Sequence, residues 1–360
     1  MVWAGALKTV FDDYTREFNA ETQKLIMNHR SAPRLVDLQR KMYASLHEED
    51  SAICVSDKWK PEDGIITLFV ARDDEQEATA VSEQIASKIK SGLEPNKICI
   101  LCKQKPASYT ERIISELKKL QIYARVEDDY QNLIKESIVE MLISILRLAV
   151  DIKHPHDWEY VVLKTSELWN IVSYQSDEDY LEMQDALDVE MQLLGSMMKN
   201  VASKSEFQEV LRHVIEFWGE NRIKANFPVY GQGTYLKEVL TKFRDYMWNE
   251  LESTGKDWLL AIEKFEGLHS VPIMTIHKSK GLEYDAVYFV GLEDSAFWSF
   301  KNQSEEDRCA FFVALSRAKK EIFFTFCQYR YTSRFPKQKH DDINEFFELL
   351  KIPGMANIIE

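Results

Sequence analysis

The strongest constraint on the fold of this chain is a continuous apolar run, Ala286 to Val290, that follows a dense polar segment. Such a run suits a strand buried on both faces of a parallel sheet. The polar segment, Thr275 to Glu283, holds hydroxyls, an imidazole, two ammonium groups, a glycine and a carboxylate within nine positions. A loop this rich in hydrogen-bond donors is suited to binding polyanions, such as the phosphates of a nucleotide or of a nucleic acid.

Strand and helix patterns alternate over the first part of the chain. Ile65 to Ala71 and Ile98 to Cys102 are strand-like. An aspartate at position 73 or 74 can cap a helix whose apolar face contains positions 78, 81, 85 and 89. Ser108 and Glu111 predict a capping box for the next helix. This alternation predicts an α/β fold in which a parallel sheet is covered by helices.

The pattern changes between about residues 154 and 267. Strand signals fade there, and apolar residues recur at helical spacing, as in the stripe formed by Leu236, Val239, Phe243 and Met247. The α/β pattern resumes at Val271. We therefore predict an all-helical subdomain inserted into the α/β domain.

Composition excludes several classes of protein. With 360 residues the chain is long enough for two domains, and 45% hydrophobic residues indicate a folded, soluble protein. The longest apolar stretch, Met141 to Val150, is interrupted by Ser144 and Arg147 and cannot span a bilayer. No secretion signal is recognisable, and five cysteines without framework spacing favour a reducing, cytoplasmic compartment.

Charge is unevenly distributed along the chain. The net charge of −14 argues against a protein that simply coats nucleic acid. Residues 176–192 include seven acidic and no basic residues, whereas residues 317–339 include seven basic residues and one acidic residue. Two solvated faces would explain this, but so would contact with a polyanion confined to the basic region.

Three motifs carry a resemblance to a known family. Thr275-Ile276-His277-Lys278-Ser279-Lys280-Gly281-Leu282-Glu283 and the apolar run after it resemble motif V of the UvrD/Rep-like superfamily 1 helicases. Residues 306–318 resemble motif VI, E-E-R-R-x-x-Y-V-A-L-T-R-A, with Cys309 in place of the second arginine and Ser316 in place of threonine. Met27 to Ser31 is similar to motif IV, N-Y-R-S, with His29 in place of tyrosine.

The resemblance covers only the second half of such a motor. The phosphate-loop pattern G-x-x-x-x-G-K-S/T is absent from the sequence, and Met1 to Ala6 resembles the end of motif III, with Ala4 in place of arginine. Residues 1–20 would then be a remnant of the first RecA-like domain. Residues 21–153 and 268–360 would form the second RecA-like domain, and residues 154–267 the inserted helical subdomain.

The resemblance implies roles at an ATP site. Arg30 and Arg317 would reach the γ-phosphate, with Arg317 as the arginine finger, because a guanidinium offers a permanent charge and forked donors. Glu283 would accept hydrogen bonds from the ribose, next to Gly281, whose position fits a positive φ or close ligand approach. The alternatives are surface salt bridges for the charged residues and an ordinary turn for the glycine. ATP and Mg²⁺ would be held mainly by the missing half.

The resemblance also implies contacts with single-stranded DNA. Thr275, His277 and Lys280 would bind the backbone without reading sequence, and Trp3 would offer a ring for base stacking. Lys103, at the end of a strand, is a further candidate for a backbone contact. A structural histidine, a core tryptophan and a solvated lysine are the alternative interpretations.

No metal site is predicted. Cys99 and Cys102 have the spacing of a zinc knuckle, but they lie within an apolar run and lack a second ligand pair at suitable spacing.

The sequence therefore predicts the C-terminal portion of an ATP-dependent DNA helicase, with 3′-to-5′ polarity by resemblance and without ATPase activity on its own. Its partners would be single-stranded DNA and the N-terminal RecA-like half, with no membrane. A different class stays open: a half-helicase that acts as a scaffold or regulator for a nuclease or DNA-repair protein. The reading frame upstream of Met1 would distinguish the two, since a phosphate loop encoded in frame would indicate the enzyme.

Overall fold

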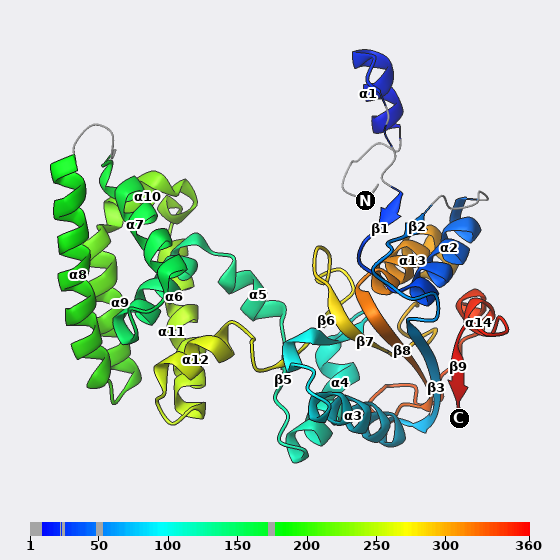
Figure 1. The fold of residues 1–360 in the computed structure, drawn as a ribbon. Coiled ribbons are helices and arrows are strands. Elements are labelled where there is room, and N and C mark those ends of the chain that lie inside the picture. Colours follow the sequence, from blue (N-terminus) through cyan, green and yellow to red (C-terminus); the bar gives the residue numbers. More distant parts are fainter. Residues whose placement is uncertain (1–8, 22, 24–25, 48–52, 172–176) are drawn as a thin grey trace.

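A seven-stranded parallel sheet forms the centre of the computed structural model, which describes residues 9–21, 23, 26–47, 53–171 and 177–360 (Figure 1). In order across the sheet, its strands are β5 (Ala124–Val126), β6 (Val271–Thr275), β4 (Ile98–Cys102), β7 (Tyr284–Val290), β8 (Ala318–Tyr329), β3 (Ile65–Asp73) and β9 (Asn357–Ile359). All neighbouring strands pair in parallel. The predicted α/β architecture is confirmed, and Ala286 to Val290 is buried as predicted.

Helices cover both faces of this sheet. On one face pack α2 (Pro33–His47), α13 (Phe300–Leu315) and α14 (Asn344–Leu350), with the rings of Phe311 and Phe346 stacked 4.2 Å apart. On the other face pack α3 (Asp74–Lys90) and α4 (Pro106–Lys119), and the short 3-10 helix η2 (Pro95–Lys97) precedes β4. The domain is therefore a three-layer sandwich with one core on each side of the sheet.

The starts of the two helices α3 and α4 test the predicted caps. Asp73 caps α3, since its side chain accepts a hydrogen bond from the backbone N–H of Gln76 at 2.9 Å. The capping box predicted at Ser108 is wrong, because α4 already begins at Pro106. Proline is pre-organised for the first helical turn and needs no N–H partner there, so the helix begins two residues before the serine.

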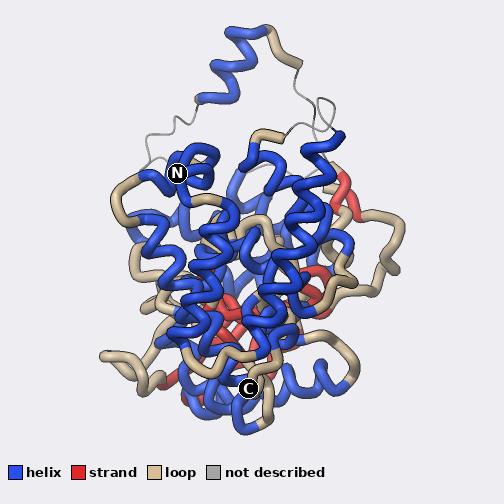
Figure 2. The backbone as a smooth tube through the Cα atoms, turned by 90° about the vertical axis from the view of Figure 1, so that its left-hand side faces the viewer, coloured by secondary structure: helices blue, strands red, loops and turns tan. Residues whose placement is uncertain are grey.

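The helical part forms a second body beside the sheet, and in the view of Figure 2 it lies in front of the strands. Its elements are α5 (Asp128–Ile134), α6 (Ser137–Val150), α7 (Pro155–Trp169), α8 (Asp177–Lys199), α9 (Lys204–Trp218), α10 (Glu220–Asn226), η3 (Pro228–Gly231), α11 (Tyr235–Ser253) and α12 (Trp258–Phe265). They share one hydrophobic core, to which α6 contributes most of its apolar side chains. The helices that share this core therefore begin before residue 154, and the predicted domain boundaries stay a prediction.

Of the N-terminal elements, α1 (Val10–Phe18) lies apart from both bodies (Figure 1), whereas β1 (Met27–Asn28) lies against the sheet domain, where Asn28 donates to Gln39 of α2. Helix α1 stands away from the sheet in Figure 1 and has no buried residue. Strand β1 pairs in parallel with β2 (Cys54–Val55) in a separate two-stranded sheet. The segment that follows β1 lies beside the start of β8, because the N–H of Ala32 donates to the carbonyl of Lys319 at 2.8 Å.

The two cysteines of β4 face different cores. Cys99 packs in the core beneath α2 and α13, whereas Cys102 packs in the core beneath α3 and α4. Since successive side chains of a strand alternate between faces, residues three positions apart cannot converge on one ion. Within the described ranges no group of three or more His, Cys, Asp and Glu side chains could hold a metal. The same residues include no helix that combines the length and apolarity of a membrane span.

Candidate functional site

Three segments that are distant in the sequence meet at the edge where β7 and β8 begin. Tyr284, the first residue of β7, lies beside Ala318, the first of β8, and its N–H donates to the carbonyl of Arg317 at 2.9 Å. The side chain of Ser31 donates to the carbonyl of Ala318 at 2.8 Å. These contacts bring the segment after β1, the end of the loop before β7 and the end of α13 together.

A single carboxylate joins two of the cations at this edge. The Arg30 Nε atom lies 2.7 Å from Glu283 Oε2, and the Lys319 Nζ atom lies 2.7 Å from Glu283 Oε1. Arg30 also donates through Nη1 to the carbonyl of Ser316 at 2.9 Å. Hydrogen bonds from Lys319 and Arg30 lower the pKa of Glu283, so this carboxylate is ionised at neutral pH.

Arg317 lies beside this group but has a different set of partners. Within the described residues, all its hydrogen bonds go to uncharged oxygens, including the carbonyls of Leu282 at 3.0 Å and Ser279 at 3.3 Å. The pKa of the Arg317 guanidinium is lowered, mainly by burial and to a smaller extent by the nearby charge of Arg30. Three cations, Arg30, Arg317 and Lys319, therefore lie at this edge, and the one carboxylate of Glu283 pairs with two of them, so the excess positive charge favours an anion.

A cleft of about 780 Å³ opens next to these charges. Its polar side includes Arg30, Glu283 and Lys319, and its apolar side includes Met27 and Trp59. This volume lies within the range of pockets that bind small molecules and cofactors. Arg317 does not line the cleft, but its neighbour Ser316 does, and Arg317 Nη2 donates to the Ser316 hydroxyl at 2.8 Å.

The backbone conformation of the loop between β6 and β7 favours glycine at position 281. Gly281 has φ +85°, and a Cβ atom at this position would meet nothing within 4 Å. Glycine is therefore favoured at position 281 because the backbone is left-handed there, and not because another group of the chain approaches closely. Ser279, which is fully buried, donates to the carbonyl of Ile276 at 2.7 Å and fixes the loop from inside.

Two of the predicted nucleic-acid residues, Thr275 and Lys103, lie at the opposite edge, where β4 and β6 end. Cys102 and Thr275 are register partners there, and the Thr275 hydroxyl accepts a hydrogen bond from the Lys278 N–H at 3.3 Å. His277 and Lys280 are both exposed in the loop that runs from this edge back to the start of β7, where the carbonyl of Ser279 contacts Arg317. Trp3 lies outside the described residues.

Lys103 lies at this edge but already has a partner. Its Nζ atom is 2.5 Å from Oδ1 of Asp307, which is almost completely buried, and 5.6 Å from the ring centre of Phe297. A DNA phosphate would have to compete with this ion pair, so Lys103 is a weaker candidate than the exposed His277 and Lys280.

Three exposed aromatic residues at this edge were not predicted as functional from the sequence. Trp298, in the connection from β7 to α13, is 73% exposed, and Tyr331 and Phe335, in the loop after β8, are 62% and 71% exposed. Rings exposed to this degree serve no core and are suited to stacking on bases. Their turn-rich context, such as Thr-Ser-Arg-Phe-Pro at residues 332–336, was the available signal.

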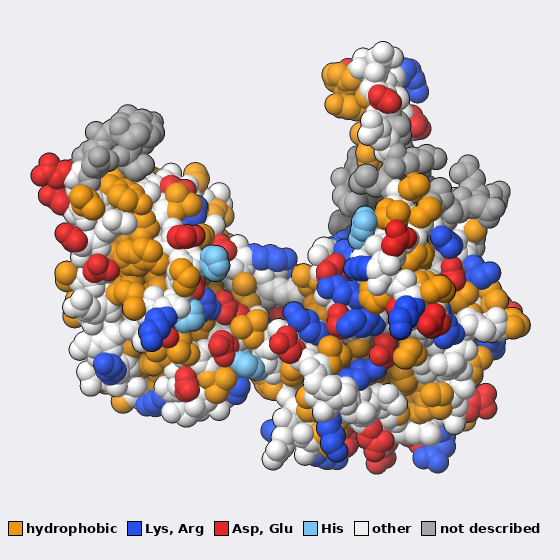
Figure 3. Space-filling model, viewed as in Figure 1, with side chains coloured by type: hydrophobic (Ala, Val, Ile, Leu, Met, Phe, Trp, Pro, Cys, Tyr) orange, Lys and Arg blue, Asp and Glu red, His pale blue; other side chains and the backbone are white. Residues whose placement is uncertain are grey.

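The basic region of residues 317–339 is divided between the two edges of the sheet. The twelve residues of β8 separate its two ends by about 36 Å at the usual rise per residue. Arg317, Lys319 and Lys320 precede or begin this strand, whereas Arg334, Lys337 and Lys339 follow it. The region is thus two separate cationic clusters. On the face drawn in Figure 3, Lys and Arg side chains gather mainly over the sheet domain.

A parallel sheet with Arg30 and Arg317 beside the starts of β7 and β8, together with a helical insertion, fits the class of nucleotide-dependent helicases that the sequence resembles. The family model described as UvrD-like helicase C-terminal domain matches residues 23–329, and this chain belongs to that family. The resemblance predicted from motifs IV, V and VI is confirmed.

Comparison with individual helicases shows how much of such proteins the chain covers. It is 23% identical over 380 residues to DNA helicase II of Haemophilus influenzae, covering 91% of this chain and 50% of that protein. It is 35% identical over 114 residues to the ATP-dependent DNA helicase Rep of Buchnera aphidicola, covering 28% and 17%. The solved C-terminal domain of a possible DNA helicase from Lactobacillus plantarum aligns over 92% of this chain and 99% of its own, with 10% identity and a TM-score of 0.36. The chain thus spans half or less of the length of these two helicases.

Proposed function

We propose that this chain is the C-terminal portion of an ATP-dependent DNA helicase or translocase, with Arg317 as its arginine finger. The observation that carries the proposal is the assembly of Arg30, Glu283, Arg317 and Lys319 from three distant segments at one edge of the sheet. The helicase relatives are named as ATP-dependent or as DNA helicases, which supports the same class.

The cations at the edge where β7 and β8 begin fit the chemistry of ATP hydrolysis. Phosphoryl transfer spreads negative charge over the γ-phosphate oxygens, and preorganised guanidinium groups stabilise that charge. Arg30 and Arg317 would supply these groups, and Glu283 would accept hydrogen bonds from the ribose. Arg317 is free to exchange its carbonyl partners for a phosphate without leaving a carboxylate unpaired. The N-terminal half would bind Mg²⁺ and make the remaining contacts with the phosphates.

The opposite edge supports contact with single-stranded DNA. Trp298, Tyr331 and Phe335 offer exposed rings there, and His277 and Lys280 offer exposed donors in the loop that leaves this edge after β6. A cationic groove with aromatic rings is the usual arrangement for binding a strand without reading its sequence. Nucleotide at one edge and DNA at the other would let closure of the two motor halves drive movement along the strand, with the polarity that the resemblance implies.

We expect residues 1–360 alone to show no measurable ATP hydrolysis. The sequence has no phosphate loop, so the β- and γ-phosphates and their magnesium ion lack the backbone cradle that positions them. A phosphate-release assay on the purified chain, with and without oligo-dT, measures this directly. DNA-stimulated turnover that survives repeated purification would contradict the assignment of the chain to the second half of the motor.

We expect the chain to bind single-stranded DNA weakly, in the micromolar range or weaker at physiological salt, and with little dependence on sequence. Replacing His277 and Lys280 with alanine should weaken binding to all sequences alike and flatten its salt dependence. Fluorescence anisotropy over a salt series, with oligo-dT and a mixed sequence of equal length, provides the measurement.

A matched control for this experiment removes charge elsewhere. Lys90 and Lys97 are exposed lysines at the end of α3 and just before β4, away from the predicted DNA edge. Alanine at both should leave the affinity and the salt slope close to those of the unchanged chain. Equal losses in the two double variants would mean that binding follows overall charge and not the loop before β7.

A further inference from the structure

The loop that displays Tyr331 and Phe335 is fastened to the sheet at both ends. The N–H of Arg330 donates to the carbonyl of Pro336 at 2.7 Å, and the N–H of Gln338 donates to the carbonyl of Gln328 at 2.9 Å. These bonds close residues 330–336 into a compact turn immediately after β8. The loop is therefore a short, shaped element, and its two exposed rings project from a closed backbone.

Side chains of the neighbouring elements hold the loop from below. The N–H of Thr332 donates to Asp74 Oδ2 at 3.1 Å, next to the cap of α3. The side chain of Gln338 accepts a hydrogen bond from the Ser295 hydroxyl at 2.6 Å and donates to the carbonyl of Pro336 at 3.2 Å. The loop is thus attached to α3 and to the connection after β7.

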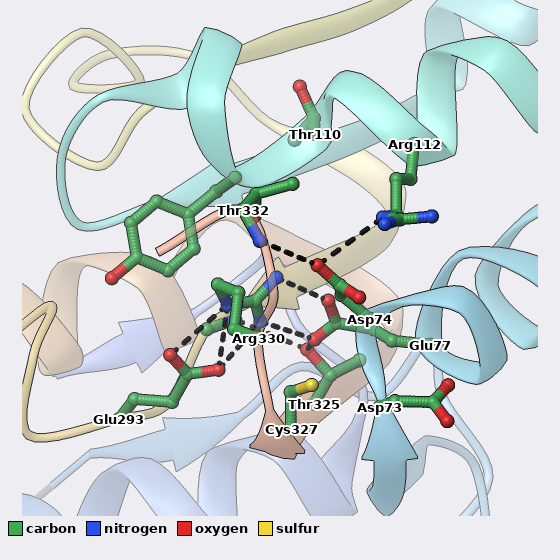
Figure 4. Close-up of polar contacts among 12 residues, drawn as sticks. Asp73, Asp74, Glu77, Thr110, Arg112, Glu293, Thr325, Cys327, Arg330 and Thr332 are labelled. Carbon is green, nitrogen blue, oxygen red and sulfur yellow. Dashed lines mark hydrogen bonds and ion pairs between the residues drawn. The ribbon is translucent and has the colours of Figure 1, made fainter. Parts of the chain in front are cut away.

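The strongest of these attachments is the guanidinium of Arg330, which lies between two carboxylates (Figure 4). Arg330 donates through Nη1 and Nη2 to Glu77 at 2.8 and 2.9 Å, and through Nη2 and Nε to Glu293 at 2.6 and 3.1 Å. All three side chains are almost completely buried, with exposed fractions of 3% or less. The ring of Tyr109 covers the guanidinium at 4.8 Å.

Stability alone does not account for this arrangement. A buried ion pair is often no more stabilising than apolar residues of similar volume, and here two carboxylates face one arginine. Burial raises the pKa of Glu293, as expected for a carboxylate that is taken out of water. The two carboxylates fix the orientation of the Arg330 guanidinium, because each binds a different side of this planar group. Since Arg330 begins the loop, the direction of the loop is fixed as well.

We propose that Glu77 and Glu293 are positioning residues that act through Arg330 to hold the loop of Tyr331 and Phe335 in the orientation that contacts single-stranded DNA. The part of this proposal that concerns DNA binding rests on the proposed function. The structural half, that the ion network holds the loop, stands on the contacts among the three side chains.

Replacing Arg330 with lysine tests the structural half. Lysine keeps the positive charge between the carboxylates but loses the fork, so the domain should fold while the loop opens. Trypsin can cut after Arg334 in the loop and after Lys337, which directly follows it, and limited proteolysis followed by mass spectrometry should show cleavage at these sites accelerated on the order of tenfold or more. Arg212→Lys is the matched control, because Arg212 also contacts two glutamates but is exposed on α9. Unchanged cleavage at both sites, with circular dichroism also unchanged, would overturn the proposal.

A double-mutant cycle tests the DNA half. In the unchanged chain, Tyr331→Ala should weaken binding to oligo-dT by about tenfold, as expected for loss of one stacked base. In the Arg330→Lys background the same substitution should cost less than about twofold, because the ring is already misplaced. Equal losses in both backgrounds would contradict the positioning role. If the unchanged chain binds no oligo-dT even at low salt, the proposed function fails, whereas the proteolysis result still decides whether the network holds the loop.

Discussion

Replacing Arg317 with alanine in the complete motor is expected to lower kcat for ATP hydrolysis by on the order of 10³-fold or more. The affinity for ATP should change far less. The negative charge that an arginine finger meets develops mainly in the transition state, so its removal raises the barrier more than it weakens the ground-state complex. Steady-state kinetics with saturating DNA and a separate nucleotide-binding measurement distinguish the two effects.

Structure and a control variant make this experiment specific. Because Arg317 also donates to the carbonyls of Leu282 and Ser279, the thermal midpoint of the variant must be checked for a folding defect. Arg212→Ala, which removes an exposed guanidinium from α9, should leave kcat nearly unchanged. An Arg317→Ala motor with kcat within a few-fold of the unchanged enzyme would refute the assignment of the finger.

The local features of the fold could be predicted from the sequence because short-range chemistry determines them. The continuous apolar run of β7 and the aspartate cap of α3 are each read from a few neighbouring residues, and both are found in the structure. The start of α4 was misplaced for a related reason. A serine three positions before a glutamate gave one signal and Pro106 gave a competing one, and the proline determined the first turn.

The residues of the candidate site were predicted from motifs, but their partners could not be. Glu283 and Arg30 are 253 positions apart, so no local pattern shows that they form an ion pair. The same limit applies to Lys103, whose partner Asp307 lies on a helix on one face of the sheet. The sequence indicated which residues carry charge, whereas the sheet determines which of those charges are already neutralised.

The edges of the sheet were the least predictable feature. The basic residues between positions 317 and 339 suggest a single surface in the sequence. Strand β8 lies between them and places them at opposite ends of the domain. Arg330 belongs to neither cluster, since it is buried between Glu77 and Glu293. Only the pairing of β8 with β3 and β7 brings these carboxylates to it.

Replacing Arg330 with methionine should lower the free energy of unfolding by about 3–5 kcal/mol at neutral pH. The substitution removes the only cation between two buried carboxylates and leaves their charges uncompensated in the interior. Urea denaturation followed by circular dichroism gives the difference between variant and unchanged chain. Arg212→Met removes a guanidinium that also contacts two glutamates but is exposed, and it should have little effect.

The pH dependence of this loss identifies its cause. Burial raises the pKa of Glu293 above the ordinary 4.5, and the charge of Arg330 opposes that rise. Without Arg330 the pKa rises further, and a carboxyl whose folded pKa is raised contributes stability at low pH that is lost as the pH increases through that value. The deficit of Arg330→Met should therefore be largest at neutral pH and shrink as the pH falls toward 4.5. Adding Glu293→Gln should recover part of the loss at neutral pH, because a neutral amide replaces one buried charge. A deficit that is the same at every pH and unaffected by Glu293→Gln would show that lost packing, and not unpaired charge, destabilises the variant.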